Sequence, residues 1–182
     1  MSVIDTLLTR NKDFAVRETL MPSLSEAMPN VKALIITCAD MRVDPAHVLG
    51  VESGEAVVLR NIGGRITPGL IEQIGLLGRI GQVAGAPPAG GREFHIVILQ
   101  HTDCGITRLA SDTALLARFF QVPEGEVALK KIHEPREAVA MDVATLRALP
   151  PLPESWFISG LVYNVATGLV DVVVPPAPLR NE

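Results

Sequence analysis

The sequence has little cysteine, few aromatic side chains and no excess of basic charge. Its 182 residues include two cysteines, one tryptophan and one tyrosine. Two cysteines cannot build a disulfide framework, which leaves free thiols or, in an exported chain, one Cys38–Cys104 bridge. The formal net charge is −4, with acidic and basic residues interspersed along the chain. A nucleic-acid-binding surface needs a basic patch, and the sequence has none.

Long apolar runs are also missing. No run approaches the roughly 20 residues that span a bilayer, and the first residues lack the basic and apolar regions of a signal peptide. The overall hydrophobic content is nevertheless 48%, which argues against disorder, and the length suffices for a sizeable core. We therefore expect a soluble, cytoplasmic protein with no membrane partner and a single domain over residues 1–182.

Short apolar runs of strand type alternate with segments of helical pattern. A proline follows a capping residue at Asp44-Pro45 and at Thr67-Pro68, which predicts that a helix starts at each place. Further helices are expected over about 107–120 and 133–149, and a surface loop over 84–91. The expected strands cover 31–38, 55–61 and 93–101, followed by a terminal hairpin of 156–164 and 168–174. This order predicts an α/β fold with a mainly parallel central sheet, an antiparallel edge strand and flanking helices.

Two helices look incompletely buried in a single chain. Residues 1–30 form an N-terminal arm whose predicted helix, 3–18, has an incomplete apolar stripe and would be only marginally stable alone. We expect this arm to pack on the body or on a partner subunit. The helix after Thr67 contains several glycines, each costing about 1 kcal/mol relative to alanine. That face is expected to lie flush against the sheet or a neighbouring subunit.

Three potential metal ligands occur at the ends of predicted strands. Cys38 ends the first strand, His101 ends the third, and Cys104 follows three residues later. Ligands of open α/β sheets bind outside the carboxyl ends of parallel strands, and two thiolates with one imidazole form an open catalytic zinc site. A predicted helix after Cys104 also favours its thiolate form. The alternative is two inert core thiols and a structural histidine.

Three short motifs together resemble the β-class carbonic anhydrases. They are C-A-D-M-R at 38–42, R-N-I-G-G at 60–64 and H-T-D-C-G at 101–105. The resemblance extends from about Val31 to Val174, and it implies the fold of that family. It also implies one Zn²⁺ per chain, bound by Cys38, His101 and Cys104.

The resemblance further implies a catalytic pair, Asp40 and Arg42, beside the zinc. Arg42 can hold the carboxylate bidentately, which orients it and keeps the pKa of Asp40 low. Released by Arg42, Asp40 would instead become the fourth zinc ligand and close the site. Asn61, Gly63 and Gly64 would place backbone near the substrate pocket, although a plain tight turn explains them equally well.

The implied reaction is the reversible hydration of CO₂ to bicarbonate and a proton through zinc-bound hydroxide. The family's usual unit implies a homodimer or a dimer of dimers. Two alternatives remain: a hydrolase of carbonyl sulfide or carbon disulfide with the same zinc ligands, and a non-catalytic zinc or thiol-binding protein. A structural site needs neither Asp40 nor Arg42, so their presence argues against the last alternative.

Overall fold

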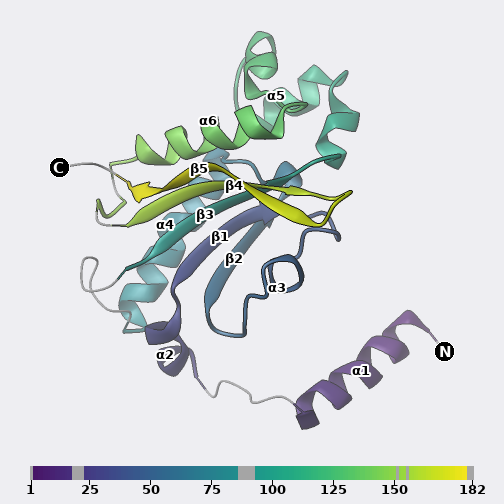
Figure 1. Cartoon of the computed structure of the whole chain (residues 1–182), viewed down its shortest axis with the longest axis vertical. Helices are drawn as coiled ribbons and strands as arrows, with labels where there is room; N and C mark the ends of the chain where they lie inside the picture. The colour runs from purple at the N-terminus through teal and green to yellow at the C-terminus, as the bar shows by residue number, and fades with distance from the viewer. Residues whose placement is uncertain (1, 18–22, 86–92, 151, 155, 180–182) are drawn as a thin grey trace.

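A five-stranded sheet forms the centre of the molecule (Figure 1). The computed structural model describes residues 2–17, 23–85, 93–150, 152–154 and 156–179. The strand order is β2-β1-β3-β4-β5; the first four strands are parallel and β5 is antiparallel to β4. The predicted α/β fold with an antiparallel edge is therefore confirmed. The strands are β1 (Ala33–Cys38), β2 (Ala56–Asn61), β3 (His95–His101), β4 (Phe157–Asn164) and β5 (Leu169–Pro178).

Side-chain caps start the helices that follow β1 and β2. The Asp44 carboxylate accepts a hydrogen bond from the N–H of Ala46, and the Thr67 hydroxyl accepts one from the N–H of Leu70, which confirms both predicted starts. The α-helices are α1 (Val3–Arg17), α2 (Leu24–Ala27), α3 (Pro45–Val48), α4 (Pro68–Val83), α5 (Thr113–Phe120) and α6 (Pro135–Arg147). Short 3₁₀ helices cover Met28–Asn30, Ile62–Gly64, Gly105–Leu109 and Glu124–Lys130.

The prediction of a helix over about 107–120 is wrong in its first half. A 3₁₀ helix, Gly105–Leu109, is followed by a break, and α5 begins only at Thr113. The Asp112 side chain accepts a hydrogen bond from the N–H of Leu115 and so caps a new helix. Most of the loop predicted over 84–91 lies outside the described residues.

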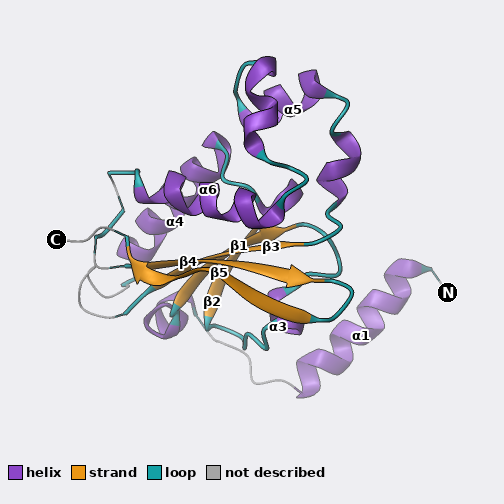
Figure 2. Ribbon diagram, turned by 45° about the horizontal axis from the view of Figure 1, so that its top comes forward, coloured by secondary structure: helices purple, strands orange, loops and turns teal. Residues whose placement is uncertain are grey.

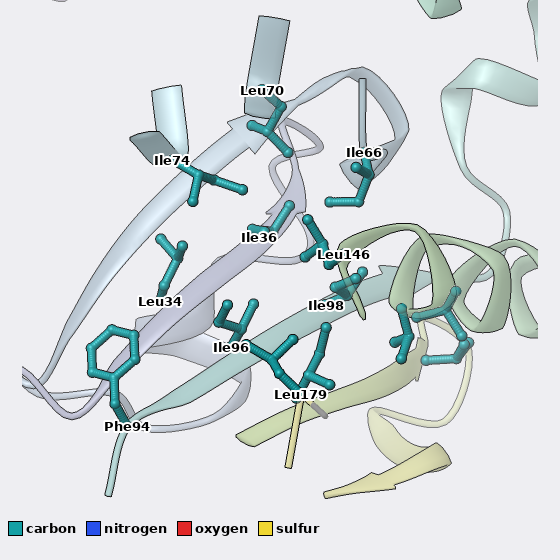
Figure 3. Packing of buried hydrophobic residues seen from close by; sticks show 14 of the residues in the cluster. Leu34, Ile36, Ile66, Leu70, Ile74, Phe94, Ile96, Ile98, Leu146 and Leu179 are labelled. Atoms are coloured by element: carbon teal, nitrogen blue, oxygen red, sulfur yellow. The ribbon is translucent and has the colours of Figure 1, made fainter. Parts of the chain in front are cut away.

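The two faces of the sheet bury alternate residues, because neighbouring side chains of a strand point to opposite sides. Figure 2 shows α4 and α6 over one face and α3 on the other. On the first face, β1 and β3 contribute Ile36 and Ile98, packed with residues of α4 and α6. Figure 3 shows part of this cluster, including Leu34, Ile36, Leu70, Ile74, Ile96, Ile98 and Leu146.

The N-terminal helix and one side of α4 present apolar residues to solvent. Helix α1 has no buried residue and stands apart from the sheet (Figure 1), so its packing on a partner subunit stays a prediction. A Cβ added at Gly69, Gly75 or Gly78 of α4 would meet open space, whereas Gly81 is buried. The sheet therefore does not lie against the first three glycines, and their packing on a neighbouring subunit stays a prediction. The exposed apolar residues are Val3, Ile4, Leu7, Leu8, Phe14 and Val16 of α1, and Leu76, Ile80 and Val83 of α4.

The chain order of the strands creates a crevice at one edge of the sheet. From β1 the chain passes to β2 on one side and then to β3 on the other side. Such a reversal leaves a crevice outside the carboxyl ends of the strands, where α/β proteins bind ligands. Within the described part of the chain, no helix has the length and apolar character to cross a membrane.

Candidate metal centre

Strands β1 and β3 bring the three predicted ligands to this crevice. Cys38 is the last residue of β1 and His101 the last of β3, and a tight turn places Cys104 beside them. All three side chains are buried, and their ligand atoms lie within 4.8 Å of one another. The two sulfur atoms are 3.6 Å apart, and both cysteines are free. Residues separated by more than 60 positions therefore form one cluster.

The imidazole of His101 offers an unused nitrogen to this cluster. Its Nδ1 lies 2.9 Å from the carbonyl oxygen of Thr102. Because a carbonyl oxygen only accepts, Nδ1 carries the proton of the neutral imidazole, and Nε2 of that form keeps its lone pair. Among the described residues, the buried Nε2 has no hydrogen-bond partner. A buried nitrogen without a partner is costly, and a metal ion would satisfy it.

The surroundings of Cys38 favour a thiolate. The backbone N–H groups of Asp40 and Gly63 point to its sulfur at 3.4 and 3.3 Å. The hydrogen bond from Cys104 lowers the pKa of Cys38 most, burial opposes this, and His101 adds to the lowering. Cys38 and burial in turn raise the pKa of Cys104. The lowering of the Cys104 pKa that a helix start would give is opposed here by the adjacent Cys38 sulfur.

The donor set fits zinc. Two thiolates at this separation repel each other unless a cation lies between them. Two sulfurs bound at about 2.3 Å to one tetrahedral zinc ion lie about 3.8 Å apart, close to the 3.6 Å observed. Cys38, Cys104 and Nε2 of His101 would hold the ion and leave a fourth position for a small ligand.

Arg42 holds Asp40 at the edge of the cluster. Its Nε donates to Oδ1 at 3.0 Å and its Nη2 donates to Oδ2 at 2.7 Å, so the guanidinium is bidentate, as the sequence predicts. These bonds hold the pKa of Asp40 well below its usual range. The Oδ2 atom lies 3.9 Å from Nε2 of His101. An ionised carboxylate with a defined orientation therefore lies next to the candidate metal position.

The turn of residues 61–64 packs against Cys38. The Asn61 side chain bonds both to the N–H and to the carbonyl of Arg65, at 2.8 and 2.7 Å. Gly64 has a φ of +62°, and a Cβ there would lie 2.8 Å from the backbone nitrogen of Cys38, so only glycine fits. Gly63 lines a cavity of about 200 Å³ together with His101 and other residues. Proximity of Asn61, Gly63 and Gly64 to substrate stays a prediction.

Sequence reasoning missed Arg60, which binds the same loop from β2. Its Nε donates to the carbonyl of Cys38 at 2.9 Å and its Nη2 to the carbonyl of Asp40 at 2.6 Å. Its Nη1 donates to the Asp44 carboxylate at 3.1 Å. The parallel pairing of β1 and β2 places Arg60 beside Thr37, one residue before Cys38. Its sequence signal was its place as the first residue of the R-N-I-G-G motif.

A buried ion pair behind the cluster was also missed. Arg65 donates to Asp142 through Nε at 2.7 Å and Nη2 at 3.3 Å, and its Nη1 donates to the carbonyl of Lys130 at 2.8 Å. The amide of Gln100, the residue before His101, donates to the same carboxylate at 2.9 Å. A signal was present, because Asp142 interrupts the apolar face that Val139 and Leu146 define on α6.

Comparison with known proteins agrees with this geometry. The family model described as carbonic anhydrase matches residues 33–139, more than half of the chain. The chain belongs to the β-carbonic anhydrases.

Individual relatives of this β-carbonic anhydrase cover nearly its whole length. Beta-carbonic anhydrase 1 of Mycobacterium tuberculosis is 28% identical over 96% of this chain and 100% of its own. The crystal structure of a carbonic anhydrase from Streptococcus mutans is 33% identical, with a TM-score of 0.68, over 95% of this chain and 98% of its own. A carbon disulfide hydrolase of an Acidianus strain is 28% identical over 90% of this chain and 85% of its own.

Proposed function

We propose that this β-carbonic anhydrase catalyses CO₂ + H₂O ⇌ HCO₃⁻ + H⁺ and binds one zinc ion per chain through Cys38, His101 and Cys104. The single observation that carries the zinc assignment is the buried, unpartnered Nε2 of His101 beside two sulfurs 3.6 Å apart. An inert core would leave this nitrogen unsatisfied, at an energetic cost that a metal ion removes. The alternative of two inert thiols accounts for the sulfur contact but gives no reason for the unpartnered nitrogen.

The residues around the cluster supply the orientation that the reaction needs. Zinc bound there would act as a Lewis acid and lower the pKa of a bound water toward neutrality. Asp40, held ionised by Arg42, accepts a hydrogen bond from the attacking water and so directs a lone pair of its oxygen at the carbon of CO₂. Since Arg42 also donates its backbone N–H to Asp40 Oδ1 at 2.9 Å, the carboxylate is fixed by three donors.

Metal analysis tests the proposed ligands. Wild-type protein should contain about one zinc per chain, and Cys38→Ser should lose it, because the thiolate is the stronger ligand. Met41→Ser is a matched control, since Met41 lies on the same loop but is exposed; it should keep the zinc. Wild-type protein without stoichiometric metal, under zinc-replete expression, would contradict the proposal.

Stopped-flow CO₂ hydration tests the reaction. Zinc-loaded wild type should be active, and Asp40→Ala should be slower by about a hundredfold with its zinc content unchanged. Loss of activity without loss of metal would assign Asp40 to orientation rather than to zinc binding. A zinc-loaded wild type that does not hydrate CO₂ at neutral or alkaline pH would exclude carbonic anhydrase activity.

Hydrolysis of carbon disulfide is the second candidate. It is favoured by one kind of observation, the similarity to carbon disulfide hydrolases, one of them 26% identical in a solved structure with a TM-score of 0.56. Carbon disulfide is linear like CO₂, so the same orientation by Asp40 would serve it. Sulfide release on incubation with carbon disulfide, at a rate above that of CO₂ hydration, would select this activity instead.

The proposal includes a cytoplasmic homodimer, as a single unit or paired further. Free, buried Cys38 and Cys104 suit a reducing compartment. The exposed apolar side of α1 supports a partner subunit, because a lone amphipathic helix of this length is marginal. Sedimentation should give twice the chain mass or a multiple of it. Leu7→Asp should shift the protein toward monomer, whereas the exposed Thr9→Asp should not.

A further inference from the structure

Asp103 contacts the side of Arg42 that Asp40 leaves free. Arg42 Nη1 donates to Asp103 Oδ2 at 3.0 Å, and Nη2 donates to the Asp103 carbonyl at 3.0 Å. A guanidinium has five N–H donors, and Asp40 takes one from Nε and one from Nη2. The two aspartates therefore use different protons, so that Asp103 adds to the hold on Arg42 and does not compete with Asp40 for it.

The backbone of Asp103 is in an unusual conformation. Its φ is +51°, in the left-handed region that glycine occupies most easily and aspartate tolerates better than most residues. The turn between His101 and Cys104 needs this conformation at position 103. Glycine would fit the turn with less strain, but it would offer no carboxylate to Arg42.

Asp40 is close enough to the metal position to need such restraint. Its Oδ2 lies 3.9 Å from the unpartnered Nε2 of His101, so a small movement would bring the carboxylate to a bound cation. Arg42 is partly exposed, and a single exposed ion pair holds a side chain only weakly. The contacts of Asp103 to Arg42 therefore reduce how often Arg42 releases Asp40.

We infer that Asp103 is a positioning residue that keeps Arg42 on Asp40 and thereby keeps the fourth metal position open. This inference rests on the proposed zinc centre. Asp103 lies between two of the ligands, so the loop that carries His101 and Cys104 also carries the anchor for Arg42. The loop that carries His101 and Cys104 is thus connected to the Asp40 carboxylate through the Arg42 guanidinium.

Anion binding to cobalt-loaded protein measures whether the fourth position is open. Co²⁺ absorbs visible light, and its spectrum changes when thiocyanate enters the coordination shell. Asp103→Gly retains the left-handed turn and removes the carboxylate, so thiocyanate should bind about fivefold more weakly than to wild type. In an Asp40→Ala background, where no carboxylate can close the site, the same substitution should change the affinity less than twofold. This double-mutant cycle isolates the action through Asp40.

Two further variants define the controls. Arg108→Ala removes only the outer, exposed partner of Asp103 and should leave the thiocyanate affinity within twofold. Asp103→Asn replaces Asp103→Gly if the glycine variant fails to bind cobalt. It removes the charge but keeps a polar side chain at position 103, and it should weaken thiocyanate binding about threefold.

If Asp103→Gly weakened thiocyanate binding equally with and without Asp40, the inference would be overturned, because a distorted ligand loop would then explain the weaker binding. An unchanged affinity in Asp103→Gly and Asp103→Asn would overturn it as well. A wild-type protein that binds no cobalt would instead overturn the proposed metal centre, and the inference with it.

Discussion

Two arginine–aspartate pairs in this chain have similar hydrogen bonds and differ mainly in the exposure of the arginine. Arg65 and Asp142 are bidentate partners with 2% and 4% of their side chains exposed. Arg42 and Asp40 are bidentate partners with 41% and 12% exposed. A buried pair has no water to replace a lost partner, whereas an exposed pair does. The first is therefore suited to hold elements together, and the second to let a carboxylate change partners.

The largest expected effect is on stability at the buried pair. Asp142→Asn leaves Arg65, which cannot lose its proton, without a counter-charge, and should lower the free energy of unfolding by about 3–5 kcal/mol. Replacing both residues together, Arg65→Met with Asp142→Leu, should recover only part of this loss, because the Gln100 amide and the Lys130 carbonyl then lose their partners. Urea unfolding measures both. A single substitution that costs less than about 1 kcal/mol would remove the distinction between the two pairs.

The partner substitution, Arg65→Met, should give a pH-dependent loss of stability. Burial raises the pKa of Asp142, and Arg65 opposes that rise, so removal of Arg65 raises it further. With the folded pKa above the unfolded value of about 3.9, stability is fully present below the unfolded pKa and is lost as pH rises through the folded one. Unfolding followed from about pH 4 to pH 8 should show this decline, and Asp142→Asn should not show it.

At the exposed pair the expected effects are reversed. Asp40→Ala should slow catalysis by about a hundredfold and change the free energy of unfolding by less than about 1 kcal/mol. CO₂ hydration and urea unfolding of the same preparation give both numbers. A stability loss as large as that of Asp142→Asn would mean that Asp40 is a structural residue.

Arg60 lies between these extremes, because it is partly buried and binds the backbone of the Asp40 loop. Arg60→Met keeps much of the apolar stem and removes three hydrogen bonds. We expect a loss of about 1–2 kcal/mol in stability and about a tenfold loss of activity. Activity that is unchanged would show that the loop keeps its shape without Arg60.

The smallest effect is expected for a pair with no role in the core or the site. Arg136 and Asp171 form an ion pair in which both side chains are more than half exposed. Arg136→Ala should change the free energy of unfolding by less than about 0.5 kcal/mol and leave activity unaltered. This variant sets the baseline for the substitutions at Arg65, Asp142, Asp40 and Arg60. A cost above 1 kcal/mol would show that exposure alone does not predict the value of an ion pair here.

Local patterns were sufficient for the sheet and for the three clustered ligands. The apolar runs around Cys38 and His101 predicted parallel strands, and parallel strands share a carboxyl edge, so their terminal residues had to meet. The helix starts at Asp44 and Thr67 followed from capping chemistry within three residues. Where a break depended on one weak signal, as at Asp112, the prediction of a continuous helix was wrong.

Partners of charged side chains that lie far apart in the sequence were not predictable in this way. Asp142 stands out on α6 as a charge on an apolar face, but nothing near it in the sequence indicates that Arg65, 77 residues away, would meet it. The same is true of Asp103 and Arg42, which are 61 residues apart. A long flexible side chain can reach many positions, so its partner depends on how helices and loops pack.

The sequence by itself determined that this chain forms an α/β sheet and that two sulfurs and an imidazole end at one edge of it, because strand periodicity and parallel pairing act over short, regular distances. The tertiary structure alone decided which arginine meets a carboxylate far away in the sequence, as Arg65 meets Asp142 and Arg42 meets Asp103. It buried the pair Arg65–Asp142 behind the cluster and left the pair Arg42–Asp40 partly exposed beside it. The degree of burial, which depends on how the elements pack, separates a pair suited to holding the fold from a pair that water can reach.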